Sequence, residues 1–506
     1  MRGFSVASAL SLLAVSALAQ PPRAPEHGRR SPRLIIRNAT VVEGNGTPAA
    51  GPKDIVIEDG IITDIVALDP VALIRGVGRR PAGEVEIEAR GKYLLPGFIN
   101  LHGHAHEDRE GVPLPVDYVL KLWLACGITT VRDVGSNTPN TLALRAKSHS
   151  GELAAPRLFV YPFFGRPRNS EQARARVREI KAQGADGIKL MGIHRDVMEA
   201  TLDEAKKLGL PVAHHTGVEE TNAWDDARFG ATSIEHWYGV PDAALKDGVQ
   251  NFPPAYNYND EVDRFRYAGR LWREADWDRL MKVFDALIAA GVAWDPTLSI
   301  YEASRDLQRA QTSPWFTEYL HPTLENYFKP NPAHHGSYFL NWTSTDETFW
   351  KENYKIWMRA LVEFERRGGA IWTGEDAGYI YRVYGFGLLR ELELHQEAGF
   401  HPLKVIQHAT VNGAKILGQP ERLGRVRAGW TADLIVVNGN PLEDLKVLYP
   451  GGVERLENGK VVRTGGIEWT IKGGIPYRVP ALLADLREIV ARARKERPSP
   501  SSSGSR

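Results

Sequence analysis

Two histidines separated by one glycine could hold a metal ion early in the chain. Residues 98–101, Phe-Ile-Asn-Leu, have the apolar character of a short buried strand, and His102 and His104 stand at its end. Residues two apart on a strand share a face, and Gly103 leaves room between the imidazoles. Two nitrogens on one face suit a metal ion. A polar turn rich in histidine is the alternative, and these residues alone leave both readings open.

Further polar side chains interrupt or end apolar segments later in the chain. Lys189 lies in Gly-Ile-Lys-Leu-Met, where burying an unpaired ammonium would be costly. A lysine that reaches solvent or pairs with an acid is the alternative. His214 and His215 are adjacent, so only one of them can face the same way on a strand. His236 and Asp376 follow two more apolar segments, and a satisfied surface histidine is the alternative for each histidine.

Helix-type and strand-type patterns alternate in the middle of the chain, which favours a parallel sheet. We predict helices at 116–126, 171–183, 196–208 and 222–229, and strands at 128–134, 158–161, 187–191, 211–215, 232–236, 292–298 and 370–373. Eight such units form a closed barrel, whose active site lies at the C-terminal ends of its strands. Short β-type runs bracket this region, between residues 34 and 65 and again between residues 432 and 462.

The stretch Pro-Gly-Phe-Ile-Asn-Leu-His-Gly-His at 96–104 resembles the first barrel strand of the amidohydrolase superfamily. It is most similar to the branch with imidazolonepropionase-like enzymes, metal-dependent prolidases and N-acyl amino acid hydrolases, and the resemblance covers roughly residues 34–465. The resemblance implies an α/β fold, a (β/α)8 TIM-type barrel with a small β-sandwich built from both chain ends.

The resemblance also implies a ligand set. His102 and His104 match the first-strand ligands, Lys189 the fourth-strand lysine that carbon dioxide carboxylates, and His215 the fifth-strand ligand. His236 matches the sixth-strand ligand. Asp376 matches the eighth-strand aspartate, which both touches metal and carries the proton.

Two positions depart from the family pattern. Glu375 stands where relatives often have Thr or Ser, which leaves open whether Glu375 or Asp376 faces the metal. His106 is a third alternating histidine, either beside the ligands or merely exposed.

The reaction implied is metal-assisted hydrolysis of a small-molecule amide or peptide, of the N-acyl amino acid or dipeptide type. Two zinc ions are favoured over one, and Asp376 acts as general base and then general acid. A single-metal cyclic amidase or lactonase with unmodified Lys189 is one alternative. An exported binding protein on a degenerate barrel, without catalysis, is another.

Composition narrows the function classes. The chain has 506 residues, with 63 Lys and Arg against 62 Asp and Glu, which gives no electrostatic footprint for nucleic acid. Residues 1–19 resemble a secretory signal peptide with a cleavage site after Ala19, so a periplasmic or secreted protein without a membrane span is expected. The single cysteine, Cys126, excludes an intrachain disulfide and is interpreted as a packing residue. A homo-oligomer remains open.

The expected organisation follows from these patterns. We predict a signal peptide at 1–19, a disordered leader at 20–33, a composite β-domain from 34–94 and 419–475, the barrel at 95–418, and a C-terminal helix with a disordered tail at 476–506.

An aromatic-rich insertion at about 250–360 contains seven of the 13 tryptophans. Loops at this face of a barrel build substrate pockets, so the insertion is either a pocket wall for bulky apolar groups or a helical excursion with its own aromatic core.

Overall fold

The computed structural model describes residues 23–496, apart from residues 79, 218–219, 247, 249–252, 258–259 and 335. The expected signal peptide and the tail from residue 497 lie outside the described residues. Within the expected leader, Arg23 pairs with Val85 and the Gly28 amide donates to the Pro476 carbonyl at 2.8 Å.

The central region contains two sets of parallel strands in a mixed α/β arrangement. One set has the order β10-β9-β6 and the other β11-β12-β13-β14. Their bounds are β6 Phe98–Gly103, β9 Ile128–Ser136, β10 Arg157–Pro162, β11 Ile188–Leu190, β12 Val212–His214, β13 Ser233–Glu235 and β14 Ala293–Asp295.

Hydrogen bonds and single bridges connect the two sets. Phe163, just after β10, pairs with Lys189 of β11. Trp294 of β14 pairs with Ile371, and the Leu101 amide of β6 donates to the Thr373 carbonyl at 3.0 Å. Successive strand ends therefore lie beside one another, and the side chains that follow them share one region.

Two predicted strands are shorter than expected. The segment at 370–373 makes only the bridge at Ile371, since the chain turns at Gly374 and Asp376 has a left-handed φ of 46°. The segment at 292–298 forms only β14, because Thr297, with φ of 46°, caps the next helix in the left-handed region.

Helices follow most strands, and the predicted helices at 116–126, 171–183, 196–208 and 222–229 are present within one or two residues at each end. Their bounds are α2 Val116–Ala125, α3 Thr138–Ser150, α4 Ser170–Ala182, α5 Arg195–Lys207, α6 Ala223–Phe229, α9 Trp277–Ala290, α14 Ser344–Arg366, α15 Phe386–Ala398, α16 Pro402–Gln407 and α17 Gly413–Ile416. Shorter helices lie at α1 Pro70–Ile74, α7 Glu261–Ala268, α8 Leu271–Glu274, α10 Leu298–Arg305, α11 Leu307–Gln311, α12 Phe316–Tyr319 and α13 Pro322–Tyr327, and α18 spans Val479–Glu496.

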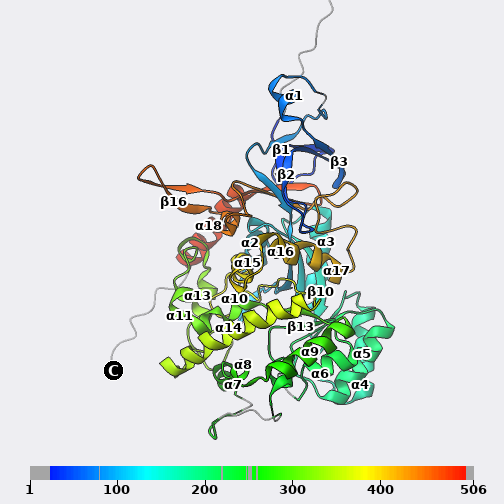
Figure 1. Cartoon of the computed structure of the whole chain (residues 1–506), viewed down its shortest axis with the longest axis vertical. Coiled ribbons are helices and arrows are strands. Elements are labelled where there is room, and N and C mark those ends of the chain that lie inside the picture. Colours follow the sequence, from blue (N-terminus) through cyan, green and yellow to red (C-terminus); the bar gives the residue numbers. More distant parts are fainter. Residues whose placement is uncertain are drawn as a thin grey trace, which may run out of the picture.

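The two flanks of the chain share one eight-stranded sheet. Its path is β19-β18-β15-β5-β1-β2-β3, with β4 paired to β1. The N-terminal strands are β1 Arg33–Val41, β2 Ala50–Glu58, β3 Ile61–Ala67, β4 Glu86–Glu88 and β5 Tyr93–Pro96, and the C-terminal ones are β15 Leu434–Val437, β18 Ile467–Lys472 and β19 Ile475–Arg478. Figure 1 shows β1, β2 and β3 together at one end of the molecule, with red C-terminal strands beneath them.

Two small hairpins complete the strands, β7 Asp108–Arg109 with β8 Val112–Pro113 and β16 Val453–Glu457 with β17 Lys460–Thr464. The β16 hairpin projects from the body in Figure 1. Among the described residues, no helix has both the length and the apolar composition needed to cross a bilayer.

Candidate metal centre

The two alternating histidines lie where β6 meets the segment that carries Asp376. His102 is within β6 and His104 follows it, and both are buried, with ring centroids 5.4 Å apart. The Asp376 amide donates to the His102 carbonyl at 2.9 Å. Burial and the nearby Lys189 lower the pKa of His102 to about 3, so its imidazole is neutral, the form that binds metal.

The Asp376 carboxylate faces three of the predicted imidazoles. Its Oδ1 lies 2.9 Å from His104 Nε2 and 3.7 Å from His102 Nε2, and its Oδ2 lies 3.8 Å from His236 Nε2. The donor atoms of His102, His104 and Asp376 all lie within 4.8 Å of one another. This spacing leaves room for one divalent ion between them.

The Glu375 carboxylate is bonded away from the imidazoles that surround Asp376. These bonds decide which of the two adjacent carboxylates faces the pocket. Its carboxylate accepts the Gly385 amide at 2.7 Å and the Leu388 amide at 3.2 Å, at the N-terminus of α15, and also the Trp123 indole N–H. Burial raises the pKa of Glu375 to about 8. Glu375 therefore caps a helix, while Asp376 lines the pocket.

Lys189 lies in β11 and is 2% exposed. Among the described residues, its Nζ has no hydrogen-bond partner, and burial lowers the pKa of the amine to about 8. An unpaired ammonium at this depth is unfavourable. A carboxyl group added to the amine would turn it into an anion that can bind a cation, so Lys189 fits a metal site better than a structural ion pair.

The remaining predicted ligands follow β12 and β13. His236 is buried and His215 is half-buried, and their ring centroids lie 4.5 Å apart. His236 has a left-handed φ of 66°, and its Nδ1 lies 2.6 Å from Thr297 Oγ1. His214 lies on the opposite side of its strand, where Nδ1 bonds to Asp226 Oδ1 at 2.7 Å. Between the two adjacent histidines, His215 is the one that lines the pocket.

All six predicted ligands line a single pocket of about 580 Å³. They come from five different strand ends or loops, in the places where the alternation of strands and helices predicts a site. The donor set is imidazole nitrogens, one carboxylate and one buried amine, and such a set fits zinc or a related divalent ion.

A buried charge network behind His102 was missed by sequence reasoning. His102 Nδ1 donates to Glu235 Oε2 at 2.6 Å, and Arg132 Nη2 donates to both Glu235 oxygens at 2.8 Å. Arg132 also lies 3.5 Å from Asp295 Oδ2. This arrangement fixes the His102 tautomer with Nε2 facing the pocket, as outer partners of metal-binding histidines do.

The sequence contains a feature from which this charge network could have been predicted. Arg132, Glu235 and Asp295 are charged residues inside apolar strands, and each is at most 1% exposed. Such residues need partners. His102, Glu235 and Asp295 also form a second group whose donor atoms lie within 4.8 Å.

His106 packs behind His104, and its two nitrogens contact tyrosines. The rings of His104 and His106 stack with centroids 5.0 Å apart. Nδ1 of His106 lies 2.7 Å from the Tyr384 hydroxyl, and Nε2 lies 3.2 Å from the Tyr379 hydroxyl. His106 therefore supports the ring of His104 rather than lining the pocket.

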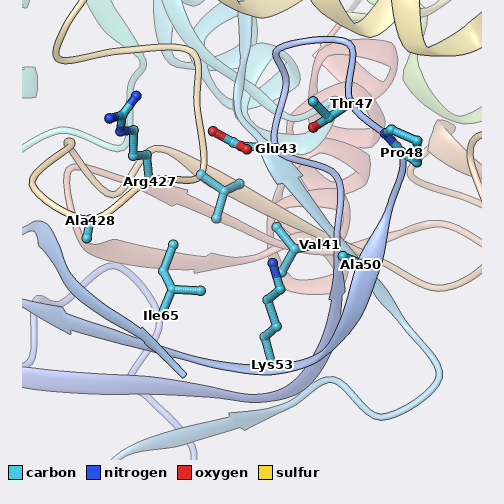
Figure 2. A pocket seen from close by; sticks show the side chains of 10 residues that line it. Val41, Glu43, Thr47, Pro48, Ala50, Lys53, Ile65, Arg427 and Ala428 are labelled. Atoms are coloured by element: carbon cyan, nitrogen blue, oxygen red, sulfur yellow. The ribbon is translucent and has the colours of Figure 1, made fainter. Parts of the chain in front are cut away.

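A second cavity, of about 270 Å³, lies on the flanking sheet. Figure 2 shows Val41, Ile65 and Lys53 around it, with Glu43 and Arg427 at its other side. Glu43 forms an ion pair with Arg425. The lining contains no histidine or cysteine, so it offers a metal poor donors. Cys126 is buried elsewhere, and burial raises its pKa well above its usual value, which fits packing.

Two segments of the chain match a known protein family. The model of the amidohydrolase family matches residues 93–250 and 383–463. A dihydroorotase from Anaeromyxobacter sp. (strain K) is 29% identical over 191 residues, which is 36% of this chain and 41% of the relative. A dihydroorotase from Thermoanaerobacter sp. (strain X514) is 37% identical over 75 residues, 15% of either chain. The chain thus spans less than half of the length of these curated relatives.

Solved structures are similar over most of the chain. A Xaa-Pro dipeptidase with methionine bound in its active site has a TM-score of 0.61 and 21% identity, over 88% of this chain and 100% of that one. The bottromycin amidohydrolase has a TM-score of 0.63 and 18% identity, over 92% of both chains. At these identities the likeness concerns the fold.

Proposed function

Because the chain belongs to the amidohydrolase superfamily, we propose that it is a metal-dependent hydrolase that cleaves a C–N amide or peptide bond. Its substrates are of the N-acyl amino acid or dipeptide type. One observation carries the proposal: the four imidazoles, the Asp376 carboxylate and the unpaired Lys189 amine line one pocket.

The proposed centre holds two zinc ions. His102, His104 and Asp376 would hold one ion, His215 and His236 would hold the other, and a carboxylated Lys189 would supply a further anionic ligand. The spacing of the His102, His104 and Asp376 donors supports the first position. The low pKa of Lys189, about 8, supports carboxylation, since the neutral amine is the form that reacts with carbon dioxide.

The protein's own groups handle the proton. Zinc, when bound, would lower the pKa of a water molecule to about 7 and would polarise the scissile carbonyl. Asp376 accepts the proton of the attacking water and donates it to the leaving amine, as general base and then general acid. Glu235 and Arg132 keep the His102 Nε2 lone pair directed into the pocket.

For the fold, the proposal is a (β/α)8 barrel at 95–418 beside a small β-sandwich built from 34–94 and 419–475. The parallel strand order and the contacts of Ile371 and Thr373 support the barrel. The pairing of β5 with both β1 and β15 supports a composite domain.

We propose that the protein is exported, on the strength of residues 1–19 alone. N-terminal sequencing of the protein recovered outside the cytoplasm tests this. A first residue of Gln20 supports the proposal, and a retained Met1 contradicts it.

The test of the reaction uses zinc-loaded protein and the variant Asp376→Asn. A pool of N-acyl amino acids, dipeptides, cyclic amides and lactones is incubated with each, and products are identified by mass spectrometry. We expect cleavage of C–N bonds by the wild type, a loss of about 100-fold or more in kcat in the variant, and nearly unchanged zinc content.

Metal content decides between the two-metal enzyme and the single-metal alternative. Two zinc ions per chain by elemental analysis support the bridged centre, and one ion per chain with cyclic substrates supports the alternative. Unchanged turnover in Asp376→Asn would remove Asp376 from the reaction, and no cleavage of any substrate would favour a binding protein.

A further inference from the structure

The pocket has a marked charge asymmetry once the six ligands are set aside. Among the other described residues that line it, Arg166 and Arg264 are the charged ones, and none is a carboxylate. Arg166 follows β10 in an exposed loop, and Arg264 lies on α7 of the aromatic insertion. Two guanidinium groups at one pocket favour an anionic ligand, and a carboxylate matches their geometry.

The aromatic insertion provides one wall of the same pocket. Phe265, Tyr301 and Tyr338 line it, and the Phe265 ring lies 5.7 Å from Tyr301 and 4.7 Å from Tyr338, centroid to centroid. Trp350, which is fully buried, packs behind them at 5.5 Å from Phe265. The tryptophans that are buried in this insertion thus form a core, and other aromatic residues face the pocket.

Two unusually exposed apolar side chains also line the pocket. Phe163 is 46% exposed after β10, and Met191 is 40% exposed after β11, next to the strand of Lys189. Large apolar groups left open to water beside a pocket often contact a ligand. Together with the aromatic wall they give the pocket an apolar surface that a bulky side chain can cover.

We propose that this pocket takes a substrate with a free carboxylate and a bulky apolar side chain. Arg166 and Arg264 bind the carboxylate, and the wall of Phe265, Tyr301 and Tyr338 receives the apolar group. The favoured class is therefore N-acyl or N-aminoacyl derivatives of large apolar amino acids. This inference rests on the proposed function, since it names the substrate of the same site.

The carboxylate part is tested by equilibrium binding, which needs no turnover. Zinc-loaded Asp376→Asn protein is titrated by calorimetry with N-acetyl-L-phenylalanine and with N-acetyl-L-phenylalaninamide, which lacks the negative charge. We expect the acid to bind roughly 10- to 100-fold more tightly than the amide. Arg166→Gln and Arg264→Gln, each added to this background, reduce that ratio, and Arg166→Lys restores part of it.

Arg168→Gln is the matched control, because Arg168 is an exposed arginine in the same loop and does not line the pocket. It leaves the acid-to-amide ratio unchanged. A change in ratio is a readout that general destabilisation does not move. Equal binding of acid and amide, or a ratio insensitive to both pocket arginines, would overturn the carboxylate assignment.

The preference for a bulky apolar side chain is tested in the same assay, by comparing the affinities of N-acetylglycine and N-acetyl-L-phenylalanine. We expect the larger ligand to bind roughly 10- to 100-fold more tightly. Phe163→Ala and Met191→Ala narrow this difference without unfolding the protein, because both side chains are already exposed; Leu456→Ala on the β16 hairpin is the control. Tighter binding of N-acetylglycine would overturn the preference.

The two proposals fail separately. Selective binding of the apolar acids by the variant, with no hydrolysis by the wild type, leaves this inference standing and removes the proposed reaction. Hydrolysis of amides with no preference for the free carboxylate removes this inference and leaves the reaction standing.

Discussion

The ε-amine of Lys189 is costly to bury, and the proposed function gives this amine a role as a metal ligand. Its Nζ has no hydrogen-bond partner among the described residues, whereas Lys472, another buried lysine, donates to the Ser148 carbonyl and hydroxyl. Burial lowers the pKa of both amines to about 8. Both amines are therefore shielded from water to a similar degree, and the two lysines differ in their hydrogen-bond partners.

This contrast gives a prediction at the residue scale. Lys189→Met removes an unpaired amine, so the metal-free variant unfolds at a temperature no lower than metal-free wild type, while zinc content falls at least about tenfold. Lys472→Met removes a bonded amine and lowers the free energy of unfolding by about 1–3 kcal/mol without changing zinc content. Thermal unfolding and elemental analysis measure both quantities. A Lys189→Met protein that keeps its zinc would exclude Lys189 as a ligand.

At the scale of elements, helix α10 connects a buried carboxylate to His236, one of the candidate metal ligands. Glu391 of α15 accepts the Leu298 amide at 2.8 Å and the Ser299 amide at 2.6 Å, the first amides of α10. Thr297 precedes them and holds His236 through its hydroxyl. The free amides at a helix start need such a partner. Glu391 therefore sets where α10 begins, and through Thr297 it positions His236.

Glu391→Ala tests this connection. Loss of the two amide hydrogen bonds to this buried carboxylate, and of its contact with His395 Nε2 at 3.2 Å, lowers the free energy of unfolding by about 2–4 kcal/mol. Because Thr297 shifts with α10, zinc affinity also falls, by about 10- to 100-fold. Denaturant unfolding and competition with a chelator measure the two effects.

Glu397→Ala serves as the control for that experiment, since Glu397 is a partly exposed carboxylate of the same helix paired with Arg305 at 2.7 Å. An exposed ion pair of this kind contributes under about 1 kcal/mol. Equal effects of the two substitutions on zinc affinity would show that Glu391 has no positioning role.

At the scale of the whole molecule, a buried pair of histidines joins three helical segments. His408 lies in a π-helical turn, and its Nδ1 is 2.9 Å from His395 Nδ1 on α15. His408 Nε2 donates to Glu365 of α14 at 2.8 Å, and Lys404 lies 3.5 Å from the same carboxylate. Burial lowers the pKa of His408 to about 4, against about 6.5 in the unfolded chain.

The sign of the resulting pH dependence follows from proton counts. Between pH 6.5 and pH 4 the unfolded chain binds a proton at His408 that the folded protein does not, so acidification lowers stability in this window. Across this whole pH window, protonation of His408 in the unfolded chain lowers the free energy of unfolding by about 3 kcal/mol. We expect His408→Gln to flatten the pH profile of the unfolding free energy between these values, measured by urea titration of metal-free protein. His149→Gln, at an exposed histidine, is the control and leaves the pH profile of the unfolding free energy unchanged. An unchanged slope in His408→Gln would show that His408 does not cause this pH dependence.

Much of the candidate site was predictable from sequence because its signals are local. The strand at 98–101 ends in His102, and residues two apart share a face, so His102 and His104 were identifiable without long-range contacts. The mixed α/β arrangement followed from the alternation of patterns. The family resemblance then supplied Lys189, His215, His236 and Asp376, and all six residues line one pocket. Their roles as ligands remain predictions.

The sequence predicted six candidate ligands, and the tertiary structure specifies which way their side chains face and which residues pack behind them. The left-handed turn at Asp376 and the capping of α15 by Glu375 separate two adjacent carboxylates, of which the sequence favoured Asp376 without excluding Glu375. The link from His102 through Glu235 to Arg132 joins three separate strands, and Arg166 and Arg264 lie 98 positions apart yet line the same pocket. Such groupings depend on contacts between distant segments, which no local pattern specifies.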